Sequence, residues 1–135
     1  MPSLPPFHSA AIINNCARVV CSGNLSYTGL VKCLDRVLEL SRGAKGIPSK
    51  YLIHFSNITE NNLTSDDVWQ YTERCAALGL SCPLWCALVA DQPAIYGTCR
   101  MMASANRNAL VSYETFENME AAEAWLETRP SQLTS

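Results

Sequence analysis

Tyr96, Gly97 and Arg100 have the residue types and spacing to bind a ligand, and they follow shortly after an apolar run at residues 84–90. Tyr96 and Arg100 are four residues apart, so on a helix they share one face. A phenol and a guanidinium on one face can stack as a cation–π pair or bind an anion together. Gly97 costs a helix about 1 kcal/mol relative to alanine, which indicates close packing or a close partner. The simpler interpretation is a helix packed tightly on a sheet, with Arg100 bonded to a carboxylate.

Thr64 and Ser65 are candidate phospho-acceptors, because their hydroxyls come directly before a helical pattern. A phosphate at a helix N-terminus meets free N–H groups and the positive end of the dipole. Asp66 and Asp67 already place negative charge in the same position. The simpler interpretation is that Thr64 or Ser65 is the N-cap of this helix.

His54 is the third candidate for chemistry, and it lies in an apolar segment typical of a strand. A general base needs a nucleophile and an orienting acid nearby, and the spacing around His54 supplies neither. An enzyme would need His54 to converge in one pocket with Tyr96, Arg100 and a carboxylate such as Asp91. The sequence has no glycine-rich phosphate loop, no G-x-S-x-G and no H-E-x-x-H motif. A histidine bonded within or beside a sheet is therefore the default interpretation.

The seven cysteines favour reduced thiols over a disulfide framework, because their number is odd and no export signal precedes them. Cys82 and Cys86 are spaced C-x3-C, and the second lies within the apolar run. A zinc site would need two further ligands, and the chain has only two histidines. We therefore expect no metal, no cofactor and a cytoplasmic location.

Composition limits the architecture and the partners. The chain has 135 residues and is 48% hydrophobic, which suits a single domain over residues 1–135 with flexible tails at 1–6 and 130–135. The net charge of −2 gives no support for nucleic-acid binding. No window approaches 18 apolar residues, so no transmembrane helix is expected.

The first elements that position these residues are two strands. Apolar stretches at residues 7–13 and 16–22 are separated by Asn14 and Asn15, which tolerate positive φ. This pattern predicts a β-hairpin. A helix over residues 9–20 is the competing interpretation, because the alanines and isoleucines there also fit a period of 3.6.

Strands and helices alternate in the rest of the chain. Apolar spacing and capping residues predict a polar loop at residues 57–63, strands at residues 50–56, 84–90 and 109–113, and helices around residues 30–38, 66–78, 93–106 and 119–126. The order ββαβαβαβα predicts an α/β fold. Its single mixed, mostly parallel five-stranded sheet has an antiparallel N-terminal hairpin and about four helices. With the run at 84–90 in the middle of the sheet, Tyr96 and Arg100 would face the crevice outside the carboxyl ends of the strands.

Two motifs carry a family resemblance from about Phe7 to Glu127. The apolar run is followed by Asp-Gln-Pro and by Tyr-Gly-Thr-Cys-Arg-Met at residues 96–101, and the chain closes with Ala-Glu-Ala-Trp-Leu at residues 122–126. This combination resembles the small bacterial SpoIIAA-like domains of the STAS fold group, which includes anti-anti-sigma factors.

The resemblance implies a non-enzymatic regulatory module that binds a protein partner or a small apolar or anionic ligand. In STAS proteins a Ser or Thr after the third strand accepts a phosphate from a kinase partner. The matching region here, residues 55–67, contains Thr64 and Ser65 but no Asp-Ser-x-Gly motif. A self-associating structural protein is a further alternative, because Trp69 near a helix start would leave apolar surface exposed.

Overall fold

The computed structural model describes residues 8–42, 48–78 and 83–130. The expected tails at 1–6 and 130–135 lie outside these residues, apart from Pro130. The chain begins with strands β1 (His8–Ile13) and β2 (Cys16–Leu25), which pair antiparallel. Asn14 and Asn15 have φ values of 51° and 62°, as a two-residue type I′ turn requires. The predicted hairpin is confirmed, and the alternative helix over residues 9–20 is wrong.

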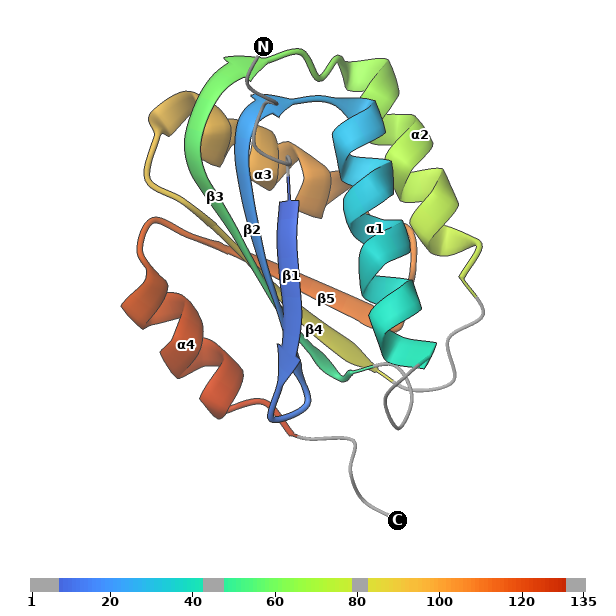
Figure 1. Ribbon diagram of the computed structural model, residues 1–135, viewed down its shortest axis with the longest axis vertical. Helices are drawn as coiled ribbons and strands as arrows, with labels where there is room; N and C mark the ends of the chain where they lie inside the picture. The colour runs from blue at the N-terminus through green and yellow to red at the C-terminus, as the bar shows by residue number, and fades with distance from the viewer. Residues whose placement is uncertain (1–7, 43–47, 79–82, 131–135) are drawn as a thin grey trace, which may run out of the picture.

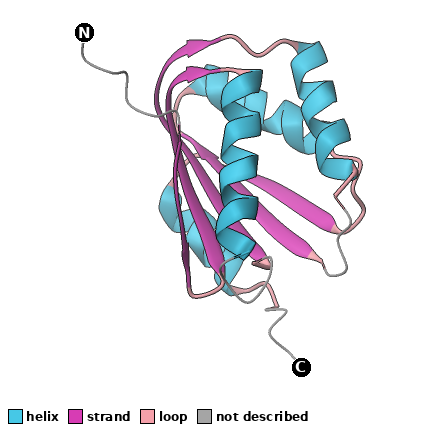
Figure 2. Ribbon diagram, turned by 45° about the vertical axis from the view of Figure 1, so that its right-hand side comes forward, coloured by secondary structure: helices cyan, strands magenta, loops and turns pink. Residues whose placement is uncertain are grey.

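The sheet contains five strands in the order β1-β2-β3-β4-β5, and all pairs after the first are parallel. Right-handed crossovers that advance in one direction leave their helices on one face. Three helices accordingly cover one face and the last covers the other (Figures 1 and 2). The remaining elements are β3 (Lys50–Asn61), β4 (Leu84–Ala90), β5 (Val111–Phe116), α1 (Tyr27–Arg42), α2 (Ser65–Ala76), α3 (Pro93–Ala105) and α4 (Met119–Glu127). The predicted element order and sheet are confirmed.

Alternation of side chains along the strands divides the interior into two cores. The larger core lies between the sheet and α1, α2 and α3, and Phe55 and Leu88 are among its largest buried side chains. The smaller core lies between the sheet and α4. In β4 every residue except Trp85 is buried, because helices cover both of its faces. The predicted doubly covered strand is therefore present, although it lies between β3 and β5 and the middle strand is β3.

The prediction of a polar loop at residues 57–63 is wrong for residues 57–61, because β3 continues to Asn61. β2 extends beside it, with Gly23 at φ +83° where the register shifts. On its other side β4 has already ended, and the Gln92 side chain takes the place of a strand. Its Nε2 donates to the Ile58 carbonyl at 3.0 Å, and its Oε1 accepts from the Ile58 N–H at 3.1 Å. One carboxamide thus satisfies the main-chain groups that a longer β4 would have paired.

The last strand and helix also differ slightly from expectation. β5 begins at Val111 and ends at Phe116, later than the predicted 109–113. Asn118, which precedes the predicted helix around residues 119–126, is the N-cap of α4, and its Oδ1 accepts from the Ala121 N–H at 2.9 Å. Trp85 packs edge-on against Trp125 with ring centroids 6.5 Å apart, which fixes α4 on β4.

Candidate functional site

Tyr96 and Arg100 lie on α3, but they do not form the pair that their spacing suggested. Tyr96 is half-buried against the larger core. Arg100 is exposed and has no ion pair, side-chain hydrogen bond or ring contact with any described residue. The shared helix face therefore turns Tyr96 into the protein and leaves Arg100 at its surface.

Gly97 is exposed on α3, and a Cβ built there would meet nothing within 4 Å. The interpretation of Gly97 as a close-packing residue is wrong, because no described part of the molecule approaches it. Its φ is not in the left-handed region either. Neither packing nor backbone conformation requires glycine at this position.

Beside α3, at the carboxyl ends of the parallel strands where a crevice was expected, polar groups of the protein form hydrogen bonds with one another. Gln92 binds the main chain of Ile58, as described above. The Asn61 Nδ2 donates to the buried Thr98 Oγ1 at 3.1 Å. These groups satisfy one another, so they tie the extension of β3 to α3.

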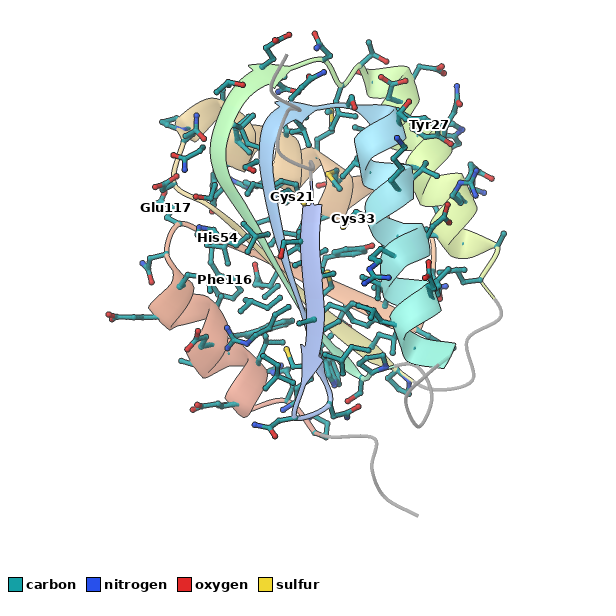
Figure 3. The ribbon with its side chains drawn as sticks, in the orientation of Figure 1. Cys21, Tyr27, Cys33, His54, Phe116 and Glu117 are labelled. Atoms are coloured by element: carbon teal, nitrogen blue, oxygen red, sulfur yellow. The ribbon has the colours of Figure 1, made fainter. Side chains whose placement is uncertain are left out.

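His54 lies on the opposite face of the sheet from Tyr96. In the sheet register His54 is beside Val20 and Val89, and Val89 belongs to the smaller core under α4. Figure 3 shows His54 near Phe116 and Glu117, where β5 leads into α4. Tyr96 packs on the other core. The structure therefore separates the residues that the enzyme alternative needed in one pocket.

Thr64 is the N-cap of α2, as one of the two interpretations predicted. Its Oγ1 accepts from the Asp67 N–H at 3.0 Å, and its own N–H donates to Asp67 Oδ2 at 3.1 Å. This reciprocal pair is a capping box. Ser65 follows as the first residue of α2, and its side chain is exposed.

Trp69 is exposed to 52%, as the self-association alternative expected. The Arg107 guanidinium lies 4.9 Å from the centroid of its ring, and Arg107 also forms an ion pair with Glu73. A cation–π contact therefore covers part of this aromatic surface.

A cavity of about 80 Å³ lies between the sheet and helices α1 and α2. It is at the amino-terminal ends of the strands, opposite the end where the sequence suggested a crevice. Its lining is almost entirely apolar. The lining residues are Val19, Cys33, Leu34, Val37, Leu38, Tyr51, Ile53, Tyr71, Cys75, Leu78, Leu84, Cys86, Val111 and Tyr113.

Tyrosine hydroxyls and cysteine thiols provide the polar atoms of the cavity wall. Burial raises the pKa values of Tyr71 and Tyr113 well above their ordinary value, and it also raises the pKa of the Cys75 thiol. Burial likewise raises the pKa values of Tyr51 and Cys86. All five groups are therefore neutral at pH 7, and the cavity can accommodate a neutral molecule without exposing it to a charge.

The sequence analysis missed the cavity, because its lining residues were assigned to the core. The apolar faces of both helices were visible in the sequence, but whether facing side chains fill the space between them depends on helix packing. Three tyrosines and three cysteines among the lining residues were the available signal.

The described residues contain no group of three or more His, Cys, Asp or Glu side chains that could hold a metal ion. Cys86 is buried in β4 as a free thiol, and Cys82 lies outside the described residues. Among the helices that the structure describes, none is both long and apolar enough to cross a membrane.

The architecture is a SpoIIAA-like fold. It is similar to the crystal structure of an uncharacterized protein from the DUF3478 family with a SpoIIAA-like fold, from Shewanella loihica PV-4. The likeness covers 93% of this chain and 98% of that chain, with a TM-score of 0.59 and 14% sequence identity. No protein-family model matches the sequence, and no curated protein matches it. The resemblance inferred from the residue motifs is thus confirmed for the fold.

Proposed function

We propose that this protein is a non-enzymatic binding module of the SpoIIAA-like type, and that it holds a small neutral ligand in the cavity beneath α1 and α2. The observation that supports this proposal is the cavity itself, at about 80 Å³ with an almost entirely apolar wall. The cavity is partly open to the surface, so its apolar wall is in contact with water when no ligand is bound. A ligand that fills it removes this apolar wall from water, which favours binding.

The character of the wall defines the class of ligand. Each buried CH₂ group contributes roughly 0.8 kcal/mol, so an apolar body is favoured. A charged group would lose its hydration and find no opposite charge among the lining residues, which costs several kcal/mol. A single hydroxyl or carbonyl could exchange hydrogen bonds with Tyr71, Tyr113 or Cys75. We therefore expect a neutral, mainly apolar molecule with at most a few polar atoms.

The placement of the reactive groups supports binding rather than catalysis. The thiolate is the nucleophilic form of cysteine, and burial raises the pKa values of Cys75 and Cys86 in the cavity wall. His54 is on the other face of the sheet. The six described cysteines are free thiols, which suits a module that works in the reducing cytoplasm.

Thermal denaturation with a panel of matched ligands tests the proposal. Neutral compounds such as indole or a medium-chain alcohol should raise the melting temperature, and a carboxylate of the same skeleton should not. A ligand at 100 times its Kd adds about 2.7 kcal/mol to the free energy of unfolding. Leu38→Trp fills the cavity and should abolish the shift, whereas Met101→Trp on the exposed part of α3 should preserve it. Equal shifts for Leu38→Trp and the unchanged protein would contradict the proposal.

A protein partner at Tyr96, Gly97 and Arg100 is the second candidate. The exposed part of α3 presents Gly97, Arg100, which bonds to no described side chain, and Met101, which is 38% exposed. A backbone without a Cβ beside an exposed guanidinium suits close approach by an acidic protein surface. Arg100→Glu should abolish co-purification of such a partner, while Ser104→Glu, farther along α3, should preserve it. Retention of the partner by Arg100→Glu would exclude this surface.

Phosphorylation of Thr64 or Ser65 is the regulation that the SpoIIAA-like fold suggests for such a partner. Both side chains are exposed at the start of α2. A cognate kinase should label the unchanged protein and should not label the variant carrying Thr64→Ala with Ser65→Ala. Persistent labelling of this variant would place the acceptor elsewhere.

A further inference from the structure

β1 forms one edge of the sheet, and its outer side pairs with no described strand. In a hairpin closed by a two-residue turn, the residues that flank the turn exchange both of their hydrogen bonds. Ile13 and Cys16 flank this turn. The main-chain groups of Ile13, Ala11 and Ser9 therefore point toward β2. Those of Ala10 and Ile12 point outward, where a further strand could bind them.

This edge lacks the features that normally prevent strand addition. Natural edge strands carry charges, prolines or bulges. Residues 8–13 contain no lysine, arginine, aspartate, glutamate or proline. Their register with β2 is continuous from His8 to Ile13. The edge is therefore straight and uncharged.

The sheet face beside this edge is mainly apolar, and no described helix packs on it. α4 packs on β3, β4 and β5 and leaves the same face of β1 and β2 open (Figure 1). Ile13 and Val20 on this open face are 52% and 44% exposed. Arg18, between them along β2, is ion-paired with Glu123 of α4 at 3.2 Å. Within β1 and β2, Arg18 is the only Lys, Arg, Asp or Glu residue, so these two strands present no unpaired carboxylate or ammonium group to another copy of the chain.

We propose that the protein forms a two-fold symmetric dimer in which β1 pairs antiparallel with β1 of a second copy. Two identical strands that run antiparallel about a two-fold axis are self-complementary, which is why a second copy fits this edge. With Ala11 on the axis, the outward groups of Ala10 face those of Ile12 in the second copy. The five strands of each copy then form one continuous sheet.

The same register joins the exposed apolar side chains. Ile13 of one copy lies opposite Ser9 of the other, and Ser9 is beside Val20 in the sheet. Because the serine side chain is small, Ile13 can reach across it toward Val20. The pairing thus satisfies the main chain and buries two of the exposed large hydrophobic side chains together.

A charge exchange at the axis tests the proposal, since residues directly opposite one another repel when they carry like charges. Light scattering over micromolar to millimolar concentrations should give twice the chain mass for the unchanged protein. Ala11→Lys and Ala11→Glu should each be monomeric, and their equimolar mixture should recover the dimer. Met101→Lys, an exposed position on α3, is the control and should remain dimeric.

Amide hydrogen exchange provides a second measurement. The N–H groups of Ala10 and Ile12 should exchange slowly in the dimer and at least tenfold faster in Ala11→Lys, with those of Ala11 and Ile13 less affected. An unchanged protein that is monomeric throughout the concentration range overturns the proposal. So does a dimer that survives in Ala11→Lys or Ala11→Glu alone, because its interface must then lie elsewhere.

Discussion

Single residues show how the same side-chain types acquire different roles through their surroundings. Cys75 lies with Tyr71 and Tyr113 in the cavity wall, whereas Cys16 lies half-buried on the other face of the sheet. Gln92 caps no helix with its side chain and instead binds both main-chain groups of Ile58. The type of residue alone could not distinguish these roles, because each depends on neighbours that are distant in the chain.

Gly97 provides a test at this scale. Because a Cβ at this exposed helical position meets nothing, Gly97→Ala should raise the free energy of unfolding by about 0.5–1 kcal/mol. Urea denaturation with Ser104→Ala as a matched exposed position on α3 would measure it. A loss of stability in Gly97→Ala would show that the backbone is constrained there.

Gln92 provides the second residue-scale test. Gln92→Ala removes both side-chain hydrogen bonds to Ile58 and leaves two main-chain groups without partners, so it should cost about 1–3 kcal/mol. Hydrogen exchange at the Ile58 amide should accelerate together with this loss. Gln70→Ala, which removes one exposed side-chain bond on α2, is the control and should change stability by less than about 0.5 kcal/mol. Equal losses in both variants would argue against the strand-like role of Gln92.

At the scale of elements, α2 and α4 begin where capping residues in the sequence specify a helix start. The capping box of Thr64 and Asp67 starts α2, and Asn118 starts α4. Strand ends are different, since β2 and β3 continue beyond the predicted limits because they pair with each other. Helix ends are local features, whereas strand ends depend on partners.

The N-cap of α2 allows a prediction about the stability of a single helix start. Thr64→Ala removes the hydroxyl that binds the Asp67 N–H and should lower the free energy of unfolding by about 1 kcal/mol. Ser65→Ala, the neighbouring hydroxyl outside the capping box, should have an effect below about 0.5 kcal/mol. Urea denaturation compares the two variants. A larger loss of unfolding free energy in Ser65→Ala than in Thr64→Ala would show that Thr64 is not the residue that caps α2.

At the scale of the whole molecule, sequential strand order places three helices on one face and one on the other. This division leaves a cavity under α1 and α2, and no described helix packs on the opposite sheet face at β1. The proposed ligand cavity and the proposed dimer interface both arise from the distribution of helices over the sheet rather than from a sequence motif.

Buried tyrosines and cysteines make the stability of the whole fold decrease at alkaline pH. Burial raises the pKa values of Tyr71, Tyr113 and Cys86 well above the ordinary values of 10.0 for tyrosine and 9.0 for cysteine. The unfolded chain therefore loses these protons first, and its ionisation favours unfolding. Stability should be intact below pH 9 and fall above it, by up to about 1.4 kcal/mol per pH unit for each ionised group.

Urea denaturation at several pH values measures this dependence. Tyr113→Phe removes one ionisable group and should make the alkaline fall shallower, even if its stability at neutral pH differs. If the unfolding free energy of Tyr113→Phe falls with pH as steeply as that of the unchanged protein, other groups cause the loss of stability.

The sequence by itself determined the order of elements, the hairpin with its Asn14–Asn15 turn, the caps of α2 and α4 and the doubly covered strand at residues 84–90. Each of these follows from side-chain periodicity or from bonds between residues close in the chain. Only the tertiary structure decided that Tyr96 and His54 lie on opposite faces, that Gln92 completes the hydrogen bonding of β3, and that α1 and α2 leave a cavity. These features depend on strand order and on the fit between packed surfaces, which relate residues far apart in the chain and leave no local pattern.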